Sequence, residues 1–214
     1  MDIRSLGLAM MLATPAAAEV KLTVGVYNLA GLPGSVLDKA TQEARRIYAK
    51  AGVETEWVEC DANGDGKSLA CQGMGLPDRP VLKIMTRSVD PSRSRDALGY
   101  AVVPEAGQFG TQAWIFFETV KAAAARDGAD VPDVLAVAMA HELGHLLLGQ
   151  NAHSGRGIMQ GAWRKTQLRS AASGLLRFTG EQAQHMQAQL QARVQNLVGV
   201  LTATGFSAAS ATAK

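Results

Sequence analysis

Two histidines and a glutamate in this sequence have the types and the spacing of a metal site. His141 and His145 are four residues apart, so on an α-helix their imidazoles project from the same face and can bind one metal ion. Glu142 lies one step round such a helix, where its carboxylate can take a proton from a water molecule on the metal. The H-E-x-x-H spacing therefore predicts a Zn²⁺ site with Glu142 as the general base.

The residues on both sides of this motif predict one long helix over residues 131–148. Apolar residues recur on nearly all of its sides, which is typical of a buried helix. Asp130 is expected to cap its N-terminus, Pro132 suits its first turn, and Gly149 is expected to end it. Because a histidine or a glutamate in a buried helix is costly without a partner, this setting favours a metal site over a chance match.

A catalytic zinc site needs a third protein ligand and leaves its fourth position to water. We expect His153 to supply it, since the ligand must come from chain that has left the helix and a flexible turn can bring this residue back. Asn151 is a poor zinc ligand and is expected to be a bystander. Glu181 is the alternative ligand, but Thr179 and Gln182 form a capping-box pattern around it, so a role at the start of a helix suffices.

With this third histidine, the segment resembles the active-site motif of the metzincin clan of metallopeptidases, and its matrixin-like members most closely. Their pattern is H-E-x-x-H-x-x-G-x-x-H, whereas Gly149 comes one residue late here and His153 two residues late. The resemblance implies that His141, His145 and His153 bind Zn²⁺. It also implies a Met-turn that places Met159 beneath the metal.

The order of predicted elements also resembles the metzincin catalytic domain over nearly all of residues 20–201. Strand-like patterns and two further helical patterns carry this resemblance. The strands are expected over residues 20–27, 53–58, 80–85, 97–103 and 113–117, with helices over 35–51 and from about 180 to 201. The resemblance implies an α+β zincin fold: a twisted, mixed five-stranded sheet with an antiparallel edge strand, a buried active-site helix, a Met-turn and a C-terminal helix.

The same resemblance implies where a substrate binds. In that fold a peptide adds as an extended strand to the antiparallel edge strand, here residues 97–103. Gly99, Tyr100 and Ala101 are the expected substrate-binding residues on that strand. Trp163 is the expected wall of the pocket for the residue after the scissile bond, and a place in the core is an equal alternative for it.

The first 18 residues are typical of an export signal. An apolar run precedes small residues that form an A-x-A-like cleavage site before Glu19. The catalytic domain is then expected over residues 19–201, with a flexible tail over 202–214. In an exported protein we expect Cys60 and Cys71 to form a disulfide. The protein is therefore expected in the periplasm or the medium.

Composition gives no reason to expect a nucleic acid or a membrane as partner. The net charge is +2 and the basic residues are scattered, and after the leader we expect no segment with the length and apolarity of a membrane-spanning helix. The segment Asp61 to Gly66 resembles the first half of a calcium loop, but Gln72 stands where the loop needs a bidentate glutamate. Turn chemistry explains the segment more simply, and calcium is the weaker alternative.

The sequence thus predicts a secreted, monomeric zinc endopeptidase that acts on protein or peptide substrates. One alternative is a zinc-binding protein of the same fold with a binding or inhibitory role, and another is a zinc amidase for non-protein amides. Glu142 favours an enzyme, because a purely structural zinc site takes a fourth protein ligand and needs no base.

Overall fold

The computed structural model describes residues 21–61, 69–88, 96–105, 108–163, 165–169 and 174–203. The elements in chain order are β1 (Lys21–Asn28), α1 (Gly34–Ala49), β2 (Glu54–Cys60), the short 3-10 helix η1 (Leu69–Cys71), β3 (Val81–Met85), β4 (Gly99–Val102), β5 (Gln112–Phe116), α2 (Phe117–Asp127), α3 (Val131–Leu148), α4 (Lys165–Arg169) and α5 (Gly180–Ala203). The predicted leader, residues 62–66 of the candidate calcium loop and residues 204–214 of the predicted tail lie outside the described residues.

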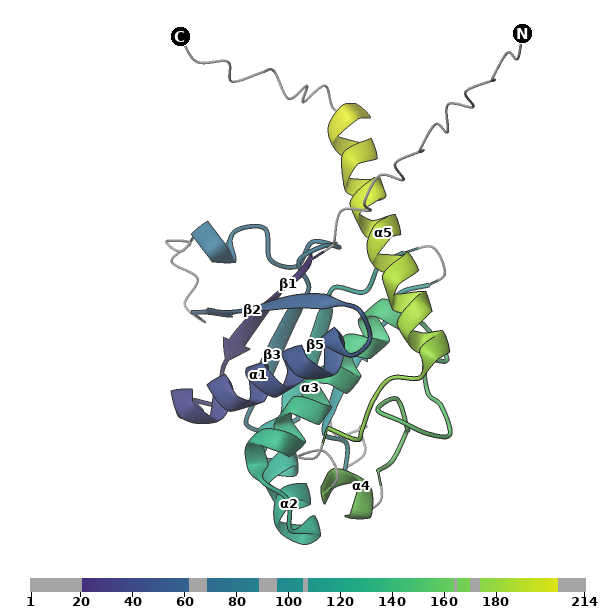
Figure 1. Ribbon diagram of the computed structural model, residues 1–214. Helices are drawn as coiled ribbons and strands as arrows, with labels where there is room; N and C mark the ends of the chain where they lie inside the picture. The colour runs from purple at the N-terminus through teal and green to yellow at the C-terminus, as the bar shows by residue number, and fades with distance from the viewer. Residues whose placement is uncertain are drawn as a thin grey trace, which may run out of the picture.

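One mixed sheet of five strands forms the centre of the fold, in the order β2-β1-β3-β5-β4. β1 is parallel to β2 and to β3, and β3 is parallel to β5, whereas β4 runs antiparallel to β5 at the edge. α1 connects β1 to the parallel β2, so these three elements form a βαβ unit. Figure 1 shows α1 and α3 next to each other over the sheet. The predicted α+β fold with an antiparallel edge strand is confirmed.

Helix α3 lies at the centre of the packing and contacts α1, α2, α5, β4 and β5. Within the described part of the chain it is the helix that is long and apolar enough to cross a membrane, and 78% of it is buried inside the protein. The expectation that no segment after the leader has this character is therefore wrong. The apolarity of α3 allows the helix to pack against neighbours on several sides at once.

Three details of the helices differ from the prediction. α2 and α4 are not predicted, and α2 begins at Phe117 directly after β5, with no turn residues to mark a helix start. Asp130 occupies the N-cap position of α3, but its side chain makes no capping hydrogen bond, so the predicted cap interaction is wrong. At the other end Gly149 is the C-cap of α3, as predicted.

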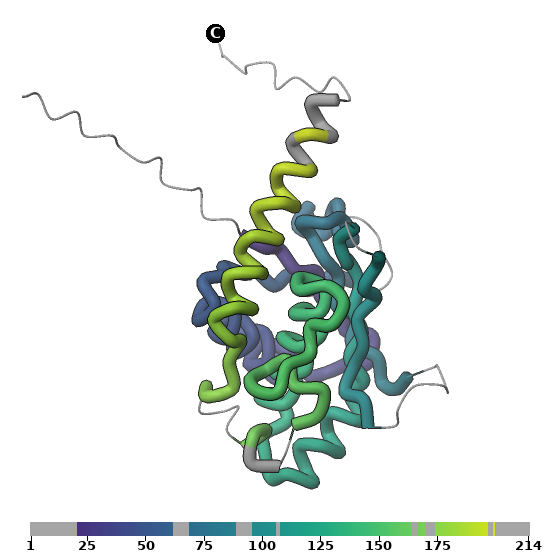
Figure 2. The backbone as a smooth tube through the Cα atoms, turned by 90° about the vertical axis from the view of Figure 1, so that its right-hand side faces the viewer, coloured from purple at the N-terminus to yellow at the C-terminus, as the bar shows by residue number. Residues whose placement is uncertain are grey.

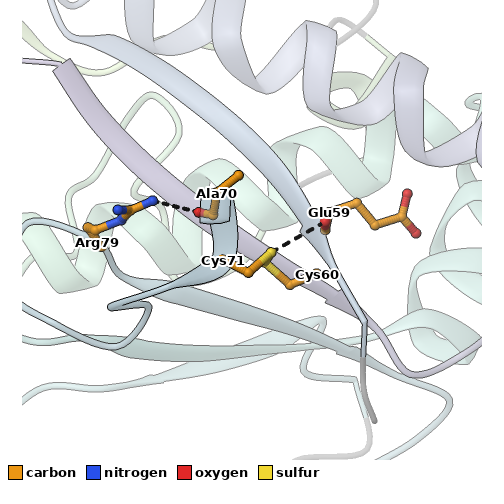
Figure 3. Close-up of a disulfide and its surroundings, with 5 residues drawn as sticks. All are labelled: Glu59, Cys60, Ala70, Cys71 and Arg79. Carbon is orange, nitrogen blue, oxygen red and sulfur yellow. Dashed lines mark hydrogen bonds between the residues drawn. A yellow bond between two sulfur atoms is a disulfide. The ribbon is translucent and has the colours of Figure 1, made fainter. Parts of the chain in front are cut away.

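The predicted disulfide is present and closes the segment between β2 and η1. Cys60 at the end of β2 is bonded to Cys71 in η1, with a Cα–Cα distance of 5.9 Å (Figure 3). The Arg79 guanidinium donates a hydrogen bond of 2.6 Å to the Ala70 carbonyl beside the disulfide. These contacts attach η1 to the edge of the sheet that lies away from β4.

Helix α5 packs along the body, as its apolar face predicts. Met186 and Leu190 are buried, whereas Val194 is 38% exposed. Figure 2 shows α5 running beside the loop that follows α3. This neighbour relation matters for the site, because that loop carries His153 and Met159.

Candidate metal centre

Helix α3 brings the imidazole rings of His141 and His145 close to each other on one face. His141 and Glu142 are each only 6% exposed, and His145 is half-buried one turn further along the helix. The Nε2 atoms of His141 and His145 lie 3.1 Å apart. The four-residue spacing therefore produces the convergence that helix geometry predicts.

The chain after α3 turns back and brings a third imidazole to this pair. Gly149 has φ 78° and Asn151 has φ 60°, both in the left-handed region that allows a sharp change of direction. The ring of His153 then lies 4.7 Å from that of His145 and 5.4 Å from that of His141, between centroids. One potential ligand atom from each of the three histidines lies within 4.8 Å of the others.

This group of three imidazoles fits a zinc ion. With Zn–N bonds of about 2.0–2.1 Å, tetrahedral coordination places ligand nitrogens about 3.3–3.4 Å apart. The 3.1 Å separation of the first two nitrogens already matches this spacing, and His153, on an exposed loop position, can adjust by rotating its ring. Three imidazoles are also the donor set of a catalytic zinc site, which keeps one position open.

A hydrogen bond fixes the orientation of the His141 ring. Nδ1 of His141 lies 2.8 Å from the carbonyl oxygen of Ile158. Since a carbonyl can only accept, Nδ1 carries the proton and Nε2 presents its lone pair toward His145. Such a bond to the far ring nitrogen is the usual support of a metal-ligating histidine.

The same burial keeps the two helical histidines neutral. Loss of solvation lowers the pKa of His141 to about 4 and that of His145 to about 3, and the neighbouring imidazoles act in the same direction. A neutral imidazole is the form that binds a metal, so at pH 7 these two residues need not lose a proton to do so.

A buried methionine, Met159, packs against α3 in the loop where the Met-turn is expected. Met159 is fully buried, and the Met159 carbonyl accepts a 2.7 Å hydrogen bond from the Ser154 backbone N–H. A Cβ at Gly144 would lie only 2.6 Å from the Met159 sulfur, so the glycine inside HELGH permits this close packing. Sequence reasoning missed the role of Gly144, although a glycine in the middle of a buried helix is the kind of pattern that marks a close approach.

An open cleft of about 1670 Å³ lies in front of the three histidines and Glu142. It is lined by all four of the residues proposed from the sequence to bind substrate, namely Gly99, Tyr100, Ala101 and Trp163. A Cβ at Gly99 would lie 2.8 Å from Cγ of Glu142 and 2.3 Å from the Trp114 carbonyl oxygen. The absence of a side chain at Gly99 thus lets the edge strand pass close to the carboxylate.

Trp163 lies at the cleft wall and also packs against the core, the two positions expected for it. Its ring packs edge-on against His141, with centroids 4.9 Å apart, and it lines the cleft while also contacting the core. Its Nε1 donates a 3.1 Å hydrogen bond to the Ile158 carbonyl, the same oxygen that accepts from His141. The Ile158 carbonyl group therefore holds both the Trp163 ring at the cleft wall and the His141 ring.

Glu181, the alternative third ligand, is not part of the group of three histidines. Glu181 is exposed in the first turn of α5, where Thr179 and Gln182 form the predicted capping box. Asn151 lines the cleft, and its contribution is the left-handed backbone conformation, which asparagine tolerates better than most residues. His185 is exposed in α5, near Gln189.

Tyr48 is a further residue near the site that the sequence patterns do not reveal. It is fully buried in α1, and its hydroxyl donates a 2.8 Å hydrogen bond to the carbonyl of Ala140, the residue before His141. Burial, together with the charge of Glu142, raises the pKa of Tyr48 well above its usual value. The hydroxyl therefore stays protonated and keeps α1 attached to the active-site helix.

The sheet, the buried helix and the returning loop together define a class, the metzincin-like zincin fold, and the fold of a solved structure supports this assignment. Archaemetzincin from Methanopyrus kandleri is similar over 82% of this chain and 99% of its own, with 14% sequence identity and a TM-score of 0.50. Metalloproteinase-II from Bacteroides fragilis is similar over 83% of this chain and 55% of its own, with 13% identity and a TM-score of 0.49. This chain thus spans about half the length of that second protein.

The similarity at these identities concerns the fold alone. No family model matches the sequence, and no curated protein matches it. The fold expected from the metzincin resemblance is confirmed, whereas the finer, matrixin-like resemblance stays a prediction.

The contact between Gly144 and Met159 gives a testable prediction. We expect Gly144→Ala to lower the free energy of unfolding by about 1–3 kcal/mol, because the added methyl group would overlap the methionine sulfur. Gly161→Ala is the matched control, since a Cβ there would meet the His153 ring at an ordinary 3.5 Å. Urea denaturation measures both variants, and equal stabilities would contradict the packing described.

The pKa values of the buried histidines predict how the metal-free protein responds to acid. A pKa lowered on folding means that the unfolded chain binds more protons, so stability is lost as pH falls from about 6.5 toward 4. We expect a loss of about 1–3 kcal/mol over this window, which allows for the partial solvation of His145. His141→Gln should flatten this dependence and His185→Gln, at an exposed position, should not. An identical slope in wild type and His141→Gln would rule the explanation out.

Proposed function

We propose that this protein is an exported zinc endopeptidase in which His141, His145 and His153 bind the metal and Glu142 is the general base. The observation that carries the proposal is the convergence of three imidazoles beside a carboxylate, in an open cleft bordered by an edge strand. A structural zinc site has four protein ligands and is closed, whereas this site offers three histidines among the described residues and faces solvent.

The chain supplies binding, orientation and proton transfer around the metal. When bound, Zn²⁺ supplies Lewis-acid chemistry, since it polarises a carbonyl group and lowers the pKa of water to about 7. Glu142 is beside His141 and lines the cleft, so its carboxylate can take the proton of the attacking water and pass it to the leaving amine. Because Glu142 is buried, the interactions of its carboxylate with nearby charges are less screened by solvent and therefore stronger.

The position of β4 favours a peptide as the substrate. β4 is the terminal strand of the sheet, so an extended peptide can continue the sheet by pairing with Gly99, Tyr100 and Ala101. Trp163, across the histidines, offers an apolar ring to a side chain of that peptide.

Export is part of the proposal. Disulfides form and persist in oxidising compartments, and the bond between Cys60 and Cys71 fits a protein that leaves the cytoplasm. The leader pattern over residues 1–18 supports the same conclusion.

The test compares wild type with Glu142→Gln in chain 19–214, with casein and a peptide library as substrates. We expect one zinc per chain in both proteins, a loss of activity of about 10²–10⁴-fold in the variant, and loss of wild-type activity with a zinc chelator. Glu181→Gln is the matched control and should retain full activity, because this carboxylate is exposed in α5 away from the histidine group.

Three results would contradict parts of the proposal. An active Glu142→Gln variant would remove the base from the mechanism. A wild type that binds zinc but cleaves no peptide would favour the binding or inhibitory role. Cleavage of small non-protein amides without cleavage of peptides would favour the amidase.

A further inference from the structure

The third histidine of this site lies in a turn that is two residues longer than the pattern it resembles, so something must hold the longer turn in place. A ligand on a flexible loop loses freedom when it binds a metal, and that loss weakens binding. The turn begins at Gly149 and Asn151, whose left-handed backbones set its direction but not its end. The contacts of Ala152 and Ser154, on either side of His153, show what holds the end of the turn that carries this histidine.

Gln182, in the first turn of α5, contacts both neighbours of His153. Its Nε2 donates a 3.1 Å hydrogen bond to Oγ of Ser154 and a longer one of 3.4 Å to the carbonyl of Ala152. Figure 2 shows the start of α5 beside the loop that follows α3. The Ser154 hydroxyl in turn donates to the Arg156 carbonyl at 2.8 Å.

The other half of the same amide caps helix α5. Oε1 of Gln182 accepts a 3.0 Å hydrogen bond from the backbone N–H of Thr179. The backbone N–H of Gln182 donates to Oγ1 of Thr179 at 3.2 Å. This reciprocal pair is a capping box, in which either glutamate or glutamine can act at the second position.

Capping alone therefore does not require a glutamine. The contacts to Ala152 and Ser154 do, because only the amide has N–H groups left to donate after its oxygen has been used by the cap. We propose that Gln182 is a positioning residue for the metal site: it attaches the segment that carries His153 to the start of α5 and so holds the third ligand near the other two. This inference rests on the zinc site proposed above.

Gln182→Glu separates the two roles of the side chain. The carboxylate still accepts from Thr179 and caps α5, but it cannot donate to Ala152 or Ser154. In the full chain we expect zinc affinity, measured by competition with a chromophoric chelator, to fall about 10-fold, while the stability of the metal-free protein stays at the wild-type value. The added negative charge would favour the cation, so it acts against the expected loss.

Two further variants make the test specific. Thr179→Ala removes part of the cap and keeps the donors of Gln182, so it should lower stability and leave zinc affinity within about 2-fold of wild type. Ser154→Ala removes the hydroxyl that accepts the hydrogen bond from Gln182, so it should weaken zinc binding. Its effect should not add to that of Gln182→Glu, because both variants remove the same interaction. Glu181→Gln should change neither quantity. Ser154→Ala also carries the test if Gln182→Glu does not fold.

The outcomes separate this inference from the proposed function. The positioning role would be overturned if Gln182→Glu kept wild-type zinc affinity, or if Thr179→Ala lost as much zinc affinity as Gln182→Glu. The zinc site itself would stand in either case. A wild-type protein that binds no zinc would instead remove the proposed function on which the inference rests.

Discussion

The structure depends on one constraint: helix α3 must be packed on nearly all sides and still present two imidazoles and a carboxylate to a cleft. The sheet, α1, α2 and α5 supply the packing. The open side lies toward β4 and the returning loop, which is where the histidines face. Apart from Asp133 in the first turn, the ionisable residues of α3 lie within residues 141–145. The rest of the helix is apolar and mostly buried, which is why it has the composition of a membrane-spanning helix without exposing that surface.

The loop after α3 is held to the helix by backbone groups rather than by apolar contact alone. The Ile158 carbonyl accepts hydrogen bonds from both His141 and Trp163, and the Ile158 N–H donates to the Arg177 carbonyl at 2.9 Å. The His141 ring, the cleft wall and the loop are thus connected through the backbone N–H and C=O groups of one residue, Ile158. A shift of the loop that carries Met159 would therefore move the His141 ring and the Trp163 wall of the cleft together.

Elements with regular patterns could be predicted from the sequence. The five strands, the active-site helix and the approach of His153 follow from alternation, from helical spacing and from the reach of a loop. Features that depend on distant contacts could not: α2 follows β5 without a turn, and Asp130 stands at the cap without making the cap bond. The role of Asn151 belongs to this second group, because it depends on a backbone angle that no local pattern specifies. For Gly144 the pattern marks a close approach within a buried helix, but it does not identify Met159 as the neighbour.

The identity of the third ligand is the central claim, and a crystal structure of the zinc-loaded protein tests it most directly. We expect zinc bound by imidazole nitrogens of His141, His145 and His153 at about 2.0–2.1 Å, with a fourth position left to solvent. A metal held by Asn151 or by Glu181 in place of His153, or one closed by a fourth protein ligand, would contradict it.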